Sequence, residues 1–182
     1  MIKTKSFVSL VVVIILVLSG CQKIENLLDV TFNAEYSVDL EAVIPPISNT
    51  KQADAIFSAS ATIDPNSNSK FSQYAEKIKD IEITSISAEI LSISKPVTLK
   101  VASIAVFSES RNAAWNFTNE ILTAGKILSL SNSSNQWTII QNIIKDKETF
   151  TIYIDGETDV DDVSFTVEVT VKTKVTANPL NN

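Results

Sequence analysis

The chain has 182 residues, of which 45% are hydrophobic and 20% are charged, a composition typical of a globular domain. It contains no histidine and only three glycines, which excludes the histidine-dependent nucleophile systems and the glycine-rich phosphate-binding loops. Its net charge is −6 and its one arginine is Arg111, so nucleic-acid binding is disfavoured because phosphates would be repelled.

The first 20 residues have the pattern of a cleavable signal peptide. Lys3 and Lys5 give a positive start, and an apolar run covers residues 7–18. As a helix this run would extend about 18 Å, which is too short for the roughly 30 Å hydrocarbon core of a bilayer. We therefore expect residues 1–20 to be removed rather than to remain as a transmembrane helix. The chain without them carries 13 basic and 21 acidic residues, a net charge of −8.

The apolar run ends in Leu18-Ser19-Gly20-Cys21, which resembles the lipobox of bacterial lipoproteins at every position. The resemblance implies diacylation of the Cys21 thiol, cleavage before Cys21, and acylation of the new amino group with a chain such as palmitate. Several acyl chains together exceed the marginal membrane affinity of one. Apart from the calcium ion considered below, we expect no other cofactor. The alternative is an ordinary secretory signal in which the cysteine is incidental.

Residues 21–27 are predicted to form a short tether. Position two of the mature chain is Gln22, not the aspartate that resembles an inner-membrane retention signal, and this favours the outer membrane. The stretch Gln22 to Glu25 partly resembles the surface-export signal of some Gram-negative lipoproteins. Periplasmic and surface-facing orientations both stay open.

The rest of the chain, residues 28–182, has the size of one domain. Apolar residues occupy the even positions of 28–42 and most odd positions of 163–177. A two-residue period puts the apolar side chains on one face, as in half-buried antiparallel strands. Further strands are predicted at 57–63, 80–93, 97–107 and 149–155. The phase of 80–93 slips between Ile83 and Ile86, which indicates a bulge.

Helical spacing of apolar residues predicts two short helices, at residues 69–79 and 135–147. Residues 155–162 are expected to form the turn that leads into the last strand, and residues 111–131 receive no assignment. The pattern is mainly β. It predicts an antiparallel two-sheet β-sandwich with one or two short helices packed over an end.

The acidic segment at residues 155–162 is a candidate metal site. Its alternating carboxylates are Asp155, Glu157, Asp159 and Asp161. Calcium takes six to eight oxygen ligands, and carboxylates on a loop can supply several of them. The alternative is a solvated hairpin turn, because the glycine spacing of an EF-hand is missing.

Residues 109–119 are expected to form a loop and are a second candidate, for binding an organic ligand. The residues proposed to contact it are Arg111, Asn112, Trp115, Asn116 and Phe117. Aromatic faces stack on sugar rings and amide groups bind hydroxyls, so this segment suits carbohydrate or peptide recognition. Alternatively, the two aromatic side chains belong to the hydrophobic core.

A lipobox followed by one β-rich domain resembles short Gram-negative envelope lipoproteins, which implies a location and a fold class without an activity. The first functional hypothesis is a non-enzymatic binding or structural module, anchored in the membrane by its acyl chains, with an envelope protein or glycan as partner. The second is a carrier of a small apolar ligand, held between the sheets or beneath the helix at 135–147. The third is a glycan hydrolase that uses paired carboxylates. No catalytic residue is assigned, since the missing histidine argues against an enzyme.

Overall fold

The computed structural model describes residues 28–47 and 55–180, and the statements below refer to these residues. The predicted signal peptide, Cys21 and the tether lie outside them. The strands are β1 (Val30–Ile44), β2 (Ala55–Ile63), β3 (Ile78–Ile93), β4 (Val97–Phe107), β5 (Asn112–Leu122), β6 (Ile127–Ser129), β7 (Phe150–Thr158) and β8 (Val163–Ala177). The helices are α2 (Ser69–Tyr74) and α3 (Gln136–Lys145), with short 3-10 turns at Pro65–Ser67 and Ala75–Lys77.

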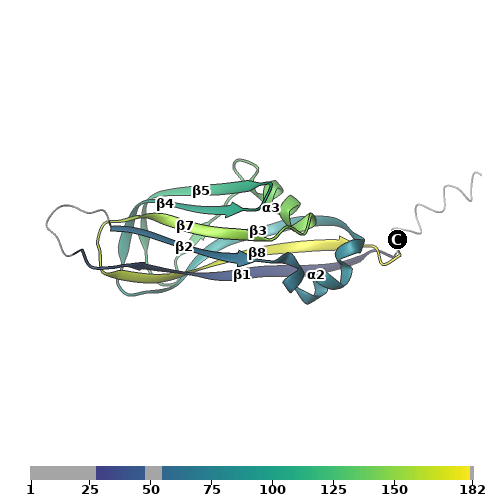
Figure 1. Ribbon diagram of the computed structural model, residues 1–182, viewed down its shortest axis with the longest axis horizontal. Helices are drawn as coiled ribbons and strands as arrows, with labels where there is room; N and C mark the ends of the chain where they lie inside the picture. Colours follow the sequence, from purple (N-terminus) through teal and green to yellow (C-terminus); the bar gives the residue numbers. More distant parts are fainter. Residues whose placement is uncertain (1–27, 48–54, 181–182) are drawn as a thin grey trace, which may run out of the picture.

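The strands form two four-stranded sheets that pack face to face (Figure 1). Sheet A has the order β1-β8-β3-β6, and sheet B has the order β2-β7-β4-β5. Every paired strand is antiparallel to its neighbour. This order is that of an eight-stranded jelly roll, in which successive strands mostly alternate between the two sheets. The predicted antiparallel β-sandwich is therefore confirmed, and the strand order adds its topology.

The hydrophobic core lies between the sheets and follows the two-residue period of the sequence. β1 and β8 pair in continuous register along 15 residues, from Val30 opposite Ala177 to Ile44 opposite Val163. The even positions of β1 and the odd positions of β8 point inward. Aromatic rings interlock across the sheets, with Phe57 and Phe165 in an edge-to-face contact at a centroid distance of 5.1 Å. The alternating apolar residues identified in the sequence thus form the inner face of sheet A.

The two sheets differ in length, and the helices compensate for the difference. The three long strands of sheet A have 15 or 16 residues, whereas the strands of sheet B have 9 or 11. At roughly 3.3 Å per residue, the long strands of sheet A are about 13 to 23 Å longer than the strands of sheet B. Helix α2 buries Phe71 against the ring of Tyr36, and α3 buries Ile140 and Ile143. The helices therefore cover inner surface of sheet A that sheet B does not reach.

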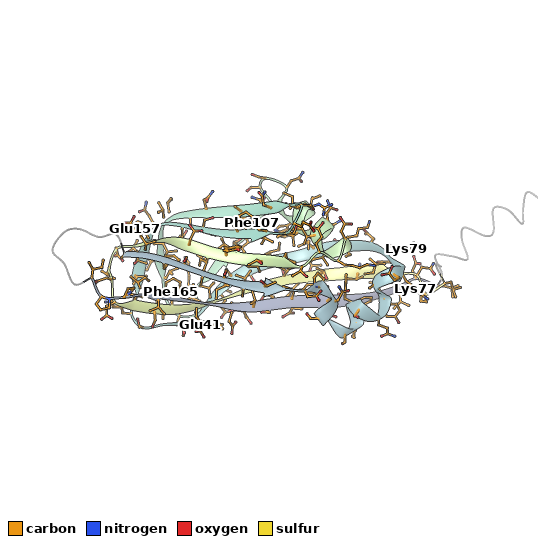
Figure 2. All side chains as sticks on the ribbon, viewed as in Figure 1. Glu41, Lys77, Lys79, Phe107, Glu157 and Phe165 are labelled. Carbon is orange, nitrogen blue, oxygen red and sulfur yellow. The ribbon has the colours of Figure 1, made fainter. Side chains whose placement is uncertain are left out.

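The molecule has two distinct ends along its long axis. The start of β1 and the end of β8 lie side by side, since Val30 pairs with Ala177, and both helices lie in this half of the molecule (Figure 1). We call this the termini end. The connections at residues 94–96, 123–126 and 159–162 lie at the other end, called the far end. Figure 2 shows Lys77 and Lys79 at the termini end and Glu157 toward the far end.

The helix predicted at residues 69–79 is shorter than expected. It ends at Tyr74, a 3-10 turn continues to Lys77, and Ile78 begins β3. Ile78 pairs with Ala177 at the end of β8. These residues join β3 and not the helix, because β8 is long enough to provide them with a partner for backbone hydrogen bonds. Helix α3 agrees with its prediction within two residues at each end.

Two further segments differ from the sequence-based expectations. The turn predicted at residues 155–162 is confined to 159–162, because β7 continues to Thr158. The Thr158 side chain is buried and donates to the carbonyl oxygen of Ala55 at 3.2 Å. The unassigned residues 111–131 contain β5 and β6. The predicted bulge in β3 is confirmed, as its register shifts between Ile83 and Ser85.

Candidate functional site

The four carboxylates predicted as calcium ligands do not converge. Asp155 and Glu157 point outward from β7, and Glu157 forms an ion pair with Lys100. Asp159 accepts a hydrogen bond from the backbone of Thr98 at 2.8 Å. Asp161 accepts one from the backbone of Ile47 at 2.6 Å. Within residues 28–47 and 55–180, no three Asp, Glu, Cys or His side chains are grouped so that they could hold a metal ion.

The loop predicted at residues 109–119 is mostly a strand. Residues from Asn112 onward pair with β4 as part of β5, so their side chains alternate between two faces. Trp115 points inward with 6% of its surface exposed, and its indole donates to the carbonyl oxygen of Ser131 at 2.7 Å. Phe117 packs against the core as well. Asn112 and Asn116 are exposed on the opposite face, so the five proposed contact residues do not form one site.

Arg111 connects the β4–β5 turn to the end of α3. Its guanidinium forms ion pairs with Asp146 and Glu148, each at 2.6 Å. Hydrogen bonds from Ser108 and Ser110, followed by the charge of Arg111, lower the pKa of Glu148. A general acid requires a raised pKa, so this group does not resemble one. The contacts assign Arg111 a structural role.

The outward-pointing surface of sheet B, near its centre and termini end, differs in chemistry from the outward surface of sheet A. We call it the sheet B face. It consists of Ser58, Ser60, Thr62, Ser103, Ala105, Phe107, Asn112, Ala114, Asn116, Thr151, Tyr153 and Asp155. The register places these residues in three rows that run across the four strands. Only one of the twelve, Asp155, carries a charge.

Two aromatic rings lie within the sheet B face. Phe107 and Tyr153 are in edge-to-face contact at a centroid distance of 5.5 Å and an interplanar angle of 86°. Their side chains remain 47% and 43% exposed. Ala105 lies directly opposite Tyr153 in the register and is buried, although it points away from the core. The rings therefore form an apolar island surrounded by hydroxyl and amide groups.

The outward surface of sheet A has the opposite character, and we call it the sheet A face. It consists of Asn33, Glu35, Ser37, Asp39, Glu41, Glu82, Ser85, Ser87, Glu89, Ser92, Thr166, Glu168, Thr170, Lys172 and Lys174. Eight of these fifteen residues are charged. Asp39, Glu168 and Glu89 lie side by side in one row. Glu41 of β1 and Phe107 of β4 point outward from different sheets, so they lie on opposite faces of the sandwich.

Phe107 and Tyr153 were not predicted as site residues, although the sequence contains a signal for them. In the strand at 149–155 the apolar positions are Phe150, Ile152 and Ile154, and Tyr153 occupies the polar phase between them. Large aromatic residues in the polar phase of an alternating strand are displayed on the surface. The same reasoning places Asn112 and Asn116 beside them once residues 112–122 are assigned as a strand.

Two open cavities lie at the margins of the sandwich. One, of about 530 Å³, lies at the far end between the last residues of β1 and the first of β8, with Pro45, Ser94 and Asp162 in its lining. The other, also about 530 Å³, lies at the edge where β1 of sheet A meets β2 of sheet B, and Thr62 of the sheet B face is part of its lining together with Glu35 and Asp64. Both are open and have polar residues in their lining, unlike the enclosed apolar site that the second functional hypothesis puts between the sheets or beneath the helix at 135–147.

One buried polar atom has no described partner. The Tyr36 hydroxyl makes no hydrogen bond within the described residues, and the side chain is 3% exposed. Burial raises the pKa of Tyr36 above its ordinary value. Since the ring packs on Phe71, the residue contributes to the core through its apolar part.

Comparisons with known proteins supply a remote likeness in fold. No family model and no curated protein matches the chain. A decameric BFDV capsid protein is 9% identical, with a TM-score of 0.41, over 81% of this chain and 99% of that one. The turnip yellow mosaic virus structure is 8% identical, with a TM-score of 0.35, over 84% and 98%. A Macrobrachium rosenbergii nodavirus particle is 10% identical, with a TM-score of 0.36, over 85% and 87%.

These likenesses carry no argument about function, and the jelly-roll topology rests on the strand order itself. Neither of the two helices in the described ranges has the length and apolar character that a bilayer span requires.

Proposed function

We propose that the protein is a lipid-anchored module of the bacterial outer membrane that binds a partner and does not catalyse a reaction. The motif Leu18-Ser19-Gly20-Cys21 supports the anchor. The observation that carries the proposal is the position of the start of β1. Val30 follows Cys21 by nine positions and begins β1 at the termini end. A membrane anchor at Cys21 would hold this end near the lipid surface.

This arrangement makes the rest of the sandwich available to a partner. The long axis runs from the termini end to the far end (Figure 1). The sheet B face lies on the flank of this axis, from its centre toward the termini end, so an anchor at that end leaves its side-facing surface accessible, most of all the row farthest from the lipid. A binding module needs an accessible surface whose chemistry differs from its surroundings, and the sheet B face meets this requirement.

The anchor is tested by intact-protein mass spectrometry and membrane fractionation of wild type, Cys21→Ala and Gln22→Ala. The wild type is expected in the membrane fraction, with a mass that begins at Cys21 and includes acyl chains. Cys21→Ala should lose the acyl mass and leave the membrane fraction. Gln22→Ala is the matched control, since it lies next to the lipobox without being part of it, and should stay lipidated. An unlipidated wild type would contradict the proposal.

A further inference from the structure

We propose that the sheet B face binds a neutral glycan chain. This inference rests on the proposed function, because it names the partner class of the binding module. It is carried by three features of the face: a pair of exposed rings, a field of uncharged hydrogen-bonding groups around them, and a charge that contrasts with the rest of the surface.

The ring pair supplies an apolar contact for a sugar. Phe107 and Tyr153 are nearly half exposed, and their edge-to-face packing leaves ring surface directed to solvent. The C–H groups on one side of a pyranose ring form an apolar patch that packs on an aromatic ring, and the tyrosine hydroxyl can bind at its edge. Ala105 lies directly opposite Tyr153 on the neighbouring strand and is buried, so its methyl group packs against the ring.

The polar groups around the rings suit a polyhydroxylated ligand. The next row toward the far end contains Ser58, Asp155, Ser103 and Asn116, one from each strand of the sheet. Hydroxyl and amide groups both donate and accept hydrogen bonds, and a carboxylate accepts them. The Asp155 side chain is exposed on the outer side of β7. Its oxygens are therefore available to sugar hydroxyls.

Charge complementarity favours a neutral ligand. The chain has a net charge of −6, and the sheet A face concentrates acidic groups. An anionic polymer would be repelled by this surface. A cationic partner would find several carboxylates on the sheet A face, whereas the sheet B face offers one, Asp155. A glycan without charged groups can form hydrogen bonds with the hydroxyl groups of the sheet B face and pack on its rings. No charge on such a ligand has to be repelled or desolvated.

The dimensions of the face also fit. Four strands at about 4.8 Å spacing span about 14 Å, and three rows at about 7 Å spacing span a similar length. This area accommodates a short stretch of a glycan chain, not a single small molecule enclosed in a pocket. Extended polymers bind such open surfaces through repeated weak contacts along their length.

The proposal is tested by affinity electrophoresis of the full chain carrying Cys21→Ser, so that the result does not depend on the lipid. The gels contain dextran, galactomannan or xyloglucan as neutral probes, and polygalacturonate or alginate as anionic probes. At least one neutral polysaccharide is expected to retard the protein. Tyr153→Ala and Phe107→Ala should each weaken retardation, by roughly fivefold to tenfold in apparent Kd, because each removes one ring contact.

Matched controls separate binding from general surface effects. Leu91→Ala and Ile127→Ala remove exposed aliphatic side chains from β3 and β6 of sheet A, 43% and 59% exposed, and should leave retardation unchanged. Asp155→Asn keeps a hydrogen-bonding group and should change apparent Kd by less than about threefold. Circular dichroism checks that each variant is folded.

Three results would overturn the inference: retardation by no neutral polysaccharide, retardation by anionic polysaccharides alone, or equal retardation of the wild type and both ring variants. A large loss in Asp155→Asn would indicate a cationic ligand and would also overturn it. Failure here leaves the membrane anchor standing, whereas an unlipidated wild type leaves this binding test intact.

Discussion

The two outer faces of the sandwich differ although the inner faces are alike. Both sheets present alternating apolar residues to a shared core. Outside, the sheet A face has eight charges among fifteen residues, and the three rows of the sheet B face have one among twelve, with the ion pair of Glu157 and Lys100 in the next row toward the far end. The core explains why the chain folds, but it does not explain this difference. The difference between the two outer surfaces is therefore encoded in the polar phase of the strands.

Charged and uncharged surfaces have different consequences for a β-sandwich. Charged side chains keep a sheet surface soluble and discourage contacts with other chains. The sheet A face meets this need. On the sheet B face, exposed rings and short polar side chains make contact with another molecule less costly, because few charges must be desolvated. The comparison predicts that changes on or beneath the two faces will affect the protein differently.

The largest effect is expected at Gly156, which lies in β7 beneath the sheet B face. A Cβ there would come within 2.5 Å of the Val101 carbonyl oxygen and 2.8 Å of the Phe57 ring. Gly156→Ala should lower the free energy of unfolding by about 3 kcal/mol, because backbone and core must move apart. Denaturant unfolding monitored by circular dichroism measures this.

Gly125→Ala is the control for the loss of a glycine. Gly125 has a φ of +78°, and a Cβ added there would meet no atom within 4 Å, so only backbone strain applies. We expect a loss of about 1 kcal/mol. If Gly156→Ala costs no more than Gly125→Ala, sheet B is not packed as tightly as the structure indicates.

A smaller effect of opposite sign is expected at Tyr36, on the inner face of sheet A. Tyr36→Phe removes a buried hydroxyl that has no described partner, so stability should stay the same or rise by about 1 kcal/mol. A loss of more than about 1 kcal/mol on denaturant unfolding would show that the hydroxyl is hydrogen-bonded, for example to a buried water.

The raised pKa of Tyr36 adds a pH dependence to the same variant. Its pKa is higher in the folded chain than in the unfolded chain, where tyrosine ionises near its ordinary value of about 10. Stability from this group is present below that value and falls as pH rises above it, since the unfolded chain then releases the proton first. The decline above pH 10 should be less steep in Tyr36→Phe, as measured by unfolding at a series of alkaline pH values.

The smallest expected effect concerns the difference in charge between the sheet A face and the sheet B face. Glu168 lies between Asp39 and Glu89 in one row of the sheet A face, and like charges directly opposite are destabilising. Glu168→Lys should raise the free energy of unfolding by about 0.5 kcal/mol at low salt and by less at high salt. Asp155→Lys is the matched change on the sheet B face, where its cross-strand neighbours are Ser58 and Ser103. An equal gain in both variants would remove the electrostatic basis of the comparison.

Much of this fold could be predicted from the sequence, because strand alternation is a local signal. The two-residue period of apolar side chains in residues 28–42 and 163–177 predicted which residues form the inner face of sheet A. The loss of this period after Ile83 predicted the bulge in β3. The pairing of these segments could not be predicted. It brings together residues 119 to 147 positions apart, from Ile44 and Val163 to Val30 and Ala177, and alternation alone does not specify a partner strand.

The candidate site was less accessible to sequence reasoning, for a physical reason. The sheet B face draws its residues from four strands, and only their register makes Phe107 and Tyr153 neighbours. The loop expected at 109–119 was suggested by a concentration of aromatic and amide groups in sequence. Pairing with β4 separates that group, with Trp115 on the core side and Asn116 on the outer side.

The long pairing of β1 with β8 gives the domain a direction-dependent mechanical resistance. A force applied through the chain before Leu28 and opposed by a load on sheet B acts along β1. The hydrogen bonds of the 15-residue ladder lie perpendicular to the strands, so this shear loads them together. A force between the two chain ends would instead separate Val30 from Ala177 and then break the bonds one after another. A protein tethered at its N-terminal end and holding a polymer on its side would be pulled in the stronger direction.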